Sequence, residues 1–462
     1  MLPIPEKALN FFLSPTIFLY FCPRKALPTM EKLIHYVWKH KLFPLAQLAT
    51  TDGQLVEVVD VGLPNSNAGP DFFNAKIKIS DTLWVGNVEI HDKASDWYMH
   101  RHDTDAHYNN VVLHVVEQAD TMVKKQNGDT PPQLVLPVPQ AVKLHYKELL
   151  TADAYPPCYK IVPDLPKFMV HSWLSALQAE RLEQRTTAIS ERLKVSNGDW
   201  EATYFVSLAR NFGFGINGDA FEQWAKAIPF HTADHHRDDL FQVEALFMGQ
   251  AGLLQADALP KQHREKAIAD DYFQRLQREY KYLAHKFALT PIDGHQWRFL
   301  RLRPQNFPYI RIAQLAQLYY NRRAGLAEMT DCTTIKEVAK LLKTQVTPYW
   351  ETHYTFGGND NKQSEKNLSK TSIELIIINT VVPFLFAYGQ YKMSEKFCDR
   401  AFAFLEALKA ENNHIVRMWK EVGLTVETAG DSQALIQLKK DYCDRKECLR
   451  CRIGYEYLKE RK

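Results

Sequence analysis

The chain has 462 residues, of which 45% are hydrophobic and 24% are charged, and its formal net charge is +3. A single hydrophobic core stops growing well below this length, so a globular chain of this size is expected to form two or three domains. The near balance of charge excludes a general attraction to nucleic acid, and any such contact must come from local basic clusters.

The first 29 residues are expected to be a leader upstream of a true start at Met30, where a regular amphipathic pattern begins. Pro15 interrupts the apolar run in this leader, which is short for a membrane span. An export signal is the minor alternative. No other stretch approaches membrane-spanning length, so no membrane partner is expected. The seven cysteines are sparse and odd in number, which favours a reducing, cytoplasmic compartment.

Residues 30–160 are predicted to form an α/β domain around a mixed sheet. The strand-like runs are short, rich in β-branched or aromatic residues, and bounded by Gly, Pro, Asn or Asp. A short helix is expected within residues 93–109, before the last two strands. The predicted elements are a helix over 31–41 and strands at 55–62, 72–79, 82–90, 111–118 and 133–138.

A proline-rich segment, residues 151–166, indicates a connection between domains. From Lys167 onward, Leu, Ile, Phe and Ala recur at spacings of three and four residues, which predicts helices with buried stripes. No fixed repeat period is present, so an irregular all-α domain is expected over 161–440. A cysteine-containing tail, 441–462, follows it.

Two carboxylates and an imidazole are expected to converge at one end of the predicted sheet. Side chains alternate along a strand, so Glu89 and His91 share a face. The turn at Gly69 and Pro70 delivers Asp71 to the start of the neighbouring strand. Hard oxygen ligands beside a group that positions water suit a divalent cation such as Mg²⁺ or Mn²⁺.

These residues resemble the motif of the PD-(D/E)XK nuclease superfamily, whose core has a restriction-endonuclease-like mixed sheet. The resemblance implies that Asp71 and Glu89 bind the metal, that the carbonyl of Ile90 completes the coordination, and that residue 91 orients the attacking water. The family usually has lysine where this chain has His91. An imidazole with an ordinary pKa near 6.5 is largely neutral at pH 7, so it can ligate metal or act as a base.

Several nearby residues are auxiliary candidates for the same site. Lys93 can supply the missing positive charge if the strand continues, and Glu57 lies on the preceding strand. A rival hypothesis is a transition-metal centre built from histidines. Two of these histidines form His-x-His, which splays the rings apart if both lie in one helix. The further candidates are His100, His102, Tyr108 and His114.

Basic and cysteine clusters offer two more candidate sites. Guanidinium groups beside aromatic side chains suit phosphate contact and base stacking, although arginines also pair with acids such as Glu244 inside helical domains. Three cysteines spaced C-x₄-C-x₂-C can bind Zn²⁺ or an Fe-S cluster with a fourth ligand, or can simply pack as small apolar groups. The clusters are Arg298, Arg301, Arg303 and Arg311, and Cys443, Cys448 and Cys451.

From about Met30, the chain also resembles a bacterial family catalogued only as a domain of unknown function. This resemblance implies a shared fold and brings no established activity. The stretches that carry it are "GPDF", "GNVEIH", "SDW", "NVVLHVV", "GDWEA", "EALFMGQAGLL", "RLRPQNFP", "INTVVPFLFAYG" and "CLRCRIG".

The preferred prediction is therefore a metal-dependent nuclease that hydrolyses phosphodiester bonds in nucleic acid, with DNA favoured over RNA. Asp71 and Glu89 would bind the metal and His91 would position water. The alternative is a nucleic-acid-binding or scaffold protein of the same fold that lost catalysis together with the lysine. A third hypothesis is a hydrolase with a histidine-rich metal centre.

Overall fold

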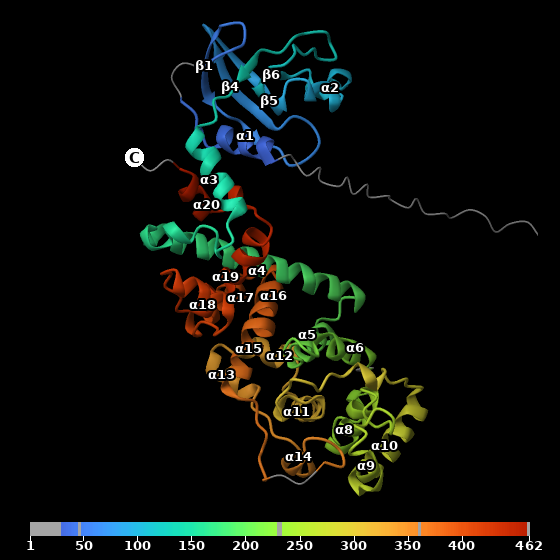
Figure 1. Cartoon of the computed structure of the whole chain (residues 1–462). Coiled ribbons are helices and arrows are strands. Elements are labelled where there is room, and N and C mark those ends of the chain that lie inside the picture. Colours follow the sequence, from blue (N-terminus) through green and yellow to red (C-terminus); the bar gives the residue numbers. More distant parts are fainter. Residues whose placement is uncertain (1–28, 45–47, 229–232, 359–361, 460–462) are drawn as a thin grey trace, which may run out of the picture. The chain divides into compact units, whose positions relative to one another are not determined.

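A computed structural model describes residues 29–44, 48–228, 233–358 and 362–459 (Figure 1). The chain divides into two compact units, Met1–Ala152 with Cys448–Lys462, and Asp153–Glu447. The first unit thus ends before the expected boundary at residue 160 and takes in most of the expected tail. The predicted leader lies outside the described residues, except for Thr29, which begins the first helix.

The first unit contains a mixed sheet with strand order β1-β2-β4-β5-β6-β7, and β3 also pairs with β4. β2, β4 and β5 are antiparallel, whereas β5, β6 and β7 are parallel. The strands are β1 (Leu48–Ala49), β2 (Leu55–Asp60), β3 (Leu63–Pro64), β4 (Phe72–Ile79), β5 (Thr82–Lys93), β6 (Val111–Gln118) and β7 (Gln133–Val135).

The sheet is nearly closed into a barrel. Thr50, next to β1, forms an antiparallel bridge with Leu134 of β7. The helical segments of this unit are α1 (Thr29–Lys39), α2 (Asp96–Met99), η1 (His102–Thr104), η2 (Ala106–Tyr108), α3 (Gln140–Thr151), η8 (Cys448–Arg450) and α20 (Arg452–Leu458).

Strand β5 separates a buried apolar face from a polar face. Val88 and Ile90 are fully buried on one face, and alternation places Glu89 and His91 on the other. The register of β4 shifts between Phe72 and Ala75. A bulge of this kind re-aims the side chains beside it.

The C-terminal segment of the first unit packs on its N-terminal and third helices. The ring of Tyr455 in α20 lies 5.1 Å from that of His40, just after α1. The hydroxyl of Tyr457 donates a hydrogen bond of 2.7 Å to Glu148 of α3. Residues 448–458 are therefore part of the fold of this unit.

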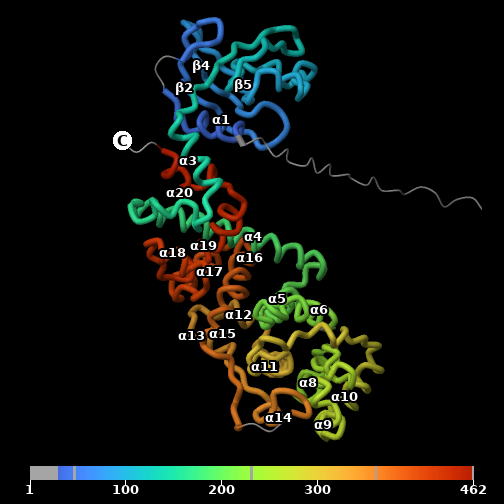
Figure 2. The backbone as a smooth tube through the Cα atoms, viewed as in Figure 1, coloured from blue at the N-terminus to red at the C-terminus, as the bar shows by residue number. Residues whose placement is uncertain are grey.

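The regular elements described in the second unit are helices, beside one isolated antiparallel bridge between Lys409 and Thr428. In Figure 2, α8, α9 and α10 gather at one end of this unit, and α16 to α19 gather with α4 at the other. Its elements are η3 (Tyr159–Asp164), α4 (Lys167–Val195), α5 (Trp200–Phe212), α6 (Gly218–Ala227), α8 (Leu240–Gln250), α9 (Arg264–Ala269), α10 (Asp271–Phe287), η4 (Gly294–Gln296), η5 (Pro304–Asn306), α11 (Pro308–Tyr320), α12 (Leu326–Asp331), α13 (Ile335–Leu341), α14 (Pro348–Thr352), α15 (Lys370–Ile376), η6 (Ile377–Val381), α16 (Val382–Tyr391), α17 (Glu395–Ala407), α18 (His414–Glu421), α19 (Ala429–Gln437) and η7 (Leu438–Cys443).

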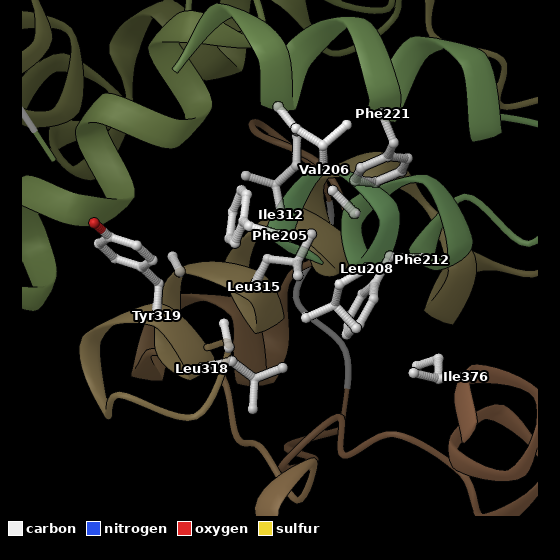
Figure 3. Close-up of a cluster of buried hydrophobic side chains, with 14 of the residues drawn as sticks. Phe205, Val206, Leu208, Phe212, Phe221, Ile312, Leu315, Leu318, Tyr319 and Ile376 are labelled. Atoms are coloured by element: carbon white, nitrogen blue, oxygen red, sulfur yellow. The ribbon is translucent and has the colours of Figure 1, made fainter. Parts of the chain in front are cut away.

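The core of this unit forms where amphipathic helices bury their apolar stripes against one another. Figure 3 shows Phe205 and Phe212 of α5 in one cluster with Ile312 and Leu315 of α11. Burial of each such side chain contributes roughly 1.5–3 kcal/mol. The predicted N-terminal mixed sheet followed by a helical region is confirmed.

One helical run, Lys370–Tyr391, is long and apolar enough to cross a membrane by length and composition alone. The expectation that no stretch beyond the leader approaches that length was therefore wrong. Two thirds of the most apolar window of this run, 67%, is buried inside the second unit. The run packs in the core of the second unit. A long apolar core helix meets the same criteria of length and composition as a membrane span.

Candidate metal centre

The β4–β5 hairpin brings the two predicted carboxylates together. Phe72 pairs with Val88 in the sheet, so Asp71 lies beside Glu89. The backbone N–H of Asp71 donates to Glu89 Oε2 over 3.1 Å, and the N–H of Ile90 donates to Asp71 Oδ2 over 2.9 Å. These two hydrogen bonds fix both carboxylates at the end of the strands.

Glu89 is buried and Asp71 is half-buried, and loss of solvent raises the pKa of each. Burial, followed by the charge of Asp71, holds the pKa of Glu89 well above its usual range. Burial likewise raises the pKa of Asp71, against the opposing effect of His35. In the described part of the chain, the ion pairs of these two groups are with imidazoles and not with Lys or Arg. Two adjacent acids that are largely shielded from water and have no fixed cation beside them fit a site for a bound cation.

A cluster of histidines adjoins the carboxylates. His91 Nδ1 lies 2.9 Å from His114 Nε2, and His91 Nε2 lies 3.1 Å from His100 Nδ1. One ring nitrogen from each of His91, His100 and His102 lies within 4.8 Å of the other two. Glu89 Oε1 faces this group, at 3.1 Å from His102 Nε2 and 3.6 Å from His91 Nε2.

His100 and His102 converge because they do not lie in one helix. The helix α2 ends at Met99, and Arg101 has a left-handed φ of 62°. The chain therefore turns between the two histidines, and their ring centroids lie 5.5 Å apart. The prediction that one helix would splay the two rings apart was wrong for this reason.

Two imidazoles of the cluster, those of His91 and His114, are held in the neutral form. Burial, and then the neighbouring His114, lowers the pKa of His91 far below its ordinary value. Burial also lowers the pKa of His114 to about 3. Neutral imidazoles present the lone pairs that a metal ion requires. The ring of Tyr108 stacks on His102 with centroids 3.8 Å apart and supports it.

Two residues of α1 join the site, and the sequence analysis did not assign them. His35 Nε2 lies 3.4 Å from Asp71 Oδ2 and 4.0 Å from Glu31 Oε1. Glu31 is itself buried. A buried glutamate four residues from a histidine on an amphipathic helix is a sequence signal, but it does not show which strand the helix covers.

Other predicted site residues lie apart from this centre. Glu57 is exposed on β2, where it pairs in register with Lys78 of β4. Strand β5 does continue to Lys93, as the prediction required, but Lys93 is exposed at its end. Ile90 contributes its N–H to Asp71, and metal coordination by its carbonyl stays a prediction.

The arginine cluster is divided between the surface and the core of the second unit. Arg298, Arg301 and Arg303 are exposed in the segment before α11. Arg311 is buried, donates to Gln314 and Asn306, and lies over the ring of Phe214. Because Arg311 is enclosed by the core, it does not belong to a surface for nucleic acid. Glu244 accepts hydrogen bonds from Tyr272, Thr347 and Trp350 and makes no ion pair with an arginine in the described residues.

The three clustered cysteines fall on either side of the division between units. Cys443 ends η7 in the second unit, whereas Cys448 and Cys451 are buried at the start of the final segment of the first. The described cysteines form no disulfide with one another. A Zn²⁺ or Fe-S site at these residues stays a prediction.

The fold and the site define a two-unit protein with a buried carboxylate and histidine centre on its mixed sheet. Residues 31–414 match the model of a family described as a protein of unknown function, DUF2851. The match covers most of the chain, so the chain belongs to this family, as the sequence motifs predicted. No curated protein and no solved structure matches the chain.

Proposed function

We propose that the first unit is a metal-dependent hydrolase of phosphodiester bonds in nucleic acid. The observation that carries the proposal is the convergence of Asp71, Glu89 and the histidines near one point, where Glu89, His91 and His102 are buried. A divalent cation bound there would polarise a phosphoryl oxygen and would lower the pKa of a bound water molecule. The N–H of Ile90 orients Asp71, and His35 faces the same carboxylate, where an imidazole can hold or accept a proton.

The arrangement of elements supports a nuclease-like fold of the PD-(D/E)XK type. A helix precedes three antiparallel strands, and the next strand, β6, runs parallel to β5. The pairing of Asp71 with Glu89 across the β4–β5 hairpin is what the motif of that superfamily would predict, and it supports the proposal. Exposed Arg298, Arg301 and Arg303 are further groups suited to phosphate contact. DNA is the favoured substrate.

The donor set favours Zn²⁺ or Mn²⁺ over Mg²⁺. The residues proposed to bind the metal are Glu89 and the three histidines His91, His100 and His102. Imidazole nitrogens suit these borderline cations, whereas Mg²⁺ prefers oxygen ligands and retained water. For the metal site, we therefore prefer the histidine-rich centre that the sequence offered as a rival hypothesis. For the reaction, we keep the hydrolysis of nucleic acid.

Cleavage assays test the proposed reaction. Purified protein is mixed with single- and double-stranded DNA and RNA in the presence of Mg²⁺, Mn²⁺ or Zn²⁺. Glu89→Gln and Asp71→Asn are expected to reduce cleavage more than about 100-fold, because each removes a negative charge beside the cation. Glu57→Gln, on exposed β2, should cleave at the wild-type rate. Wild-type cleavage by Glu89→Gln, or no cleavage of any substrate by the wild type, contradicts the proposal.

Metal retention tests the donor set independently of activity. After dialysis against metal-free buffer, elemental analysis is expected to find about one Zn²⁺ or Mn²⁺ per chain, since three imidazoles and a carboxylate bind such ions tightly. His102→Ala should lose this ion. His107→Ala is the matched control, because His107 is exposed and pairs with Asp105 outside the cluster. A wild-type protein that retains no metal would show that the histidines do not bind one.

A second candidate function is nucleic-acid binding without catalysis. Both ring nitrogens of His91 face other histidines, so this residue does not replace the lysine of the superfamily motif as a group that orients water. Binding of DNA without cleavage under every metal condition would favour this candidate.

A further inference from the structure

A groove of about 790 Å³ opens beside β5 in the first unit. Its lining comes from three parts of the chain, namely the β4–β5 hairpin, the start of β6, and the loop before β7. Asparagine is frequent in it. Its lining residues include Asn74, Trp84, Asn87, Asn109, Lys125 and Asp129.

Trp84 is the exposed tryptophan of the chain. Its exposure is 48%, whereas the other eight tryptophans are buried or half-buried. An indole kept in water forgoes the stabilisation that burial would give, so an exposed tryptophan in a groove indicates a binding surface. Trp84 pairs with Ile77 of β4 in the sheet, which fixes its backbone.

The amide groups of the groove are also held by the fold. Asn74 has a left-handed φ of 54° at the bulge of β4, and its backbone N–H donates to Asn87 Oδ1 over 3.4 Å. Asn109 contacts the side chain of Gln126 and the backbone of Asn127. Amide side chains hydrogen-bond the edges of nucleobases through paired donor and acceptor groups.

We propose that this groove binds an unpaired nucleotide of a single-stranded nucleic acid, with its base stacked on Trp84. The inference rests on the proposed function, because it names the form of the substrate. A base exposes its faces for stacking only when it is unstacked from its own strand, so the groove selects single-stranded regions or ends over intact duplex.

The groove and the candidate metal centre share strand β5, although Asp71, Glu89 and the clustered histidines do not line the groove. Asn87 precedes Glu89 by two residues on the same strand and faces the same side of the sheet. The two side chains therefore start roughly 7 Å apart. Trp84, three residues before Asn87, alternates to the opposite face of β5, so stacking on Trp84 does not depend on the metal centre.

The charge of the groove favours a nucleotide over a neutral sugar. Lys125 Nζ donates to the backbone carbonyls of Asn109 and Val111, which fixes a cation in the lining. Asp129 lies 3.9 Å from this ammonium group and offsets part of its charge. A phosphate is attracted to such a cation, whereas a neutral sugar gains nothing from it.

Binding assays on metal-free full-length protein test this inference. The probe is a fluorescein-labelled single-stranded 12-mer oligodeoxynucleotide in EDTA, followed by fluorescence anisotropy, with the matched duplex measured in parallel. Trp84→Ala is expected to weaken binding of the single strand at least about fivefold, because one stacking contact is lost. Trp84→Phe should keep most of the affinity. Leu55→Ala, another exposed apolar residue of the same sheet, is the matched control.

The outcomes separate this inference from the proposed reaction. Equal affinity of Trp84→Ala and Leu55→Ala for the single strand overturns the groove proposal, as does a preference for duplex. Selective loss in Trp84→Ala supports it even if no substrate is ever cleaved, because EDTA removes any need for catalysis. If the wild type cleaves DNA but Trp84→Ala leaves the KM unchanged, the groove proposal fails and the catalytic one stands.

Discussion

Trp97→Ala is expected to destabilise the first unit by about 3–5 kcal/mol, the usual range for a tryptophan removed from a core. Trp97 in α2 is fully buried, and its indole N–H donates to the carbonyl of Lys124 over 2.9 Å. Its ring also lies 5.1 Å from that of His114 and 5.4 Å from that of His102. The substitution therefore removes the support of the histidine cluster as well as core volume.

Hydrogen–deuterium exchange of β6 peptides is the suitable measurement for this substitution. A melt of the whole chain would mix the unfolding of two units, whereas exchange reports the unit that carries the change. Trp97→Phe should lose about 1 kcal/mol, since it keeps an aromatic ring but not the N–H. Met99→Ala, exposed on the same helix, should exchange like the wild type. Wild-type protection of β6 in Trp97→Ala would contradict the structure.

Glu244→Ala is expected to destabilise the second unit by about 3 kcal/mol. Glu244 of α8 is fully buried and accepts hydrogen bonds from Trp350 Nε1, Tyr272 and Thr347, at 2.6, 2.8 and 3.1 Å. The two hydroxyls lie 3.1 Å apart and can pair with each other after the substitution. The indole N–H of Trp350 is then left without an acceptor in a cavity.

Glu244→Gln separates the hydrogen bonds of this carboxylate from its charge. Burial raises the pKa of Glu244 in the folded state. Between the unfolded and folded pKa values the folded chain holds more protons, so the wild type loses stability as the pH rises through that window. A glutamine amide carries no titrating proton, so Glu244→Gln should gain stability relative to the wild type between about pH 4 and pH 7. Urea-dependent hydrogen exchange of α8 peptides at both pH values measures the difference in stability between Glu244→Gln and the wild type. A difference that is the same at both pH values would contradict the raised pKa of Glu244.

The strands of the first unit could be predicted because their patterns are local. Runs such as 72–79 and 111–118 alternate or contain β-branched residues and end at turn residues, and the structure places β4 and β6 on these residues. The near closure of the sheet could not be predicted in this way. It depends on Thr50 meeting Leu134, and that pairing joins segments far apart in the chain.

The site shows the same contrast between local and long-range information. The meeting of Asp71 and Glu89 follows from one hairpin, so strand alternation was enough to predict it. The meeting of His100 and His102 depends on the left-handed backbone of Arg101, which a residue other than glycine adopts rarely. The approach of His35 requires knowing where α1 packs. Burial of Arg311 was missed because Phe214, whose ring it lies over, is far from it along the chain.

The packing of Tyr455 and Tyr457 on helices near the other end of the chain bears on how the protein is made. A ribosome releases residues 153–447 before it releases 448–458. The first unit therefore begins to emerge before the second unit but is completed after it. The helical unit can fold as soon as its own residues emerge. Until synthesis reaches α20, the surfaces of α1 and α3 that receive it stay open to chaperones and to other nascent chains.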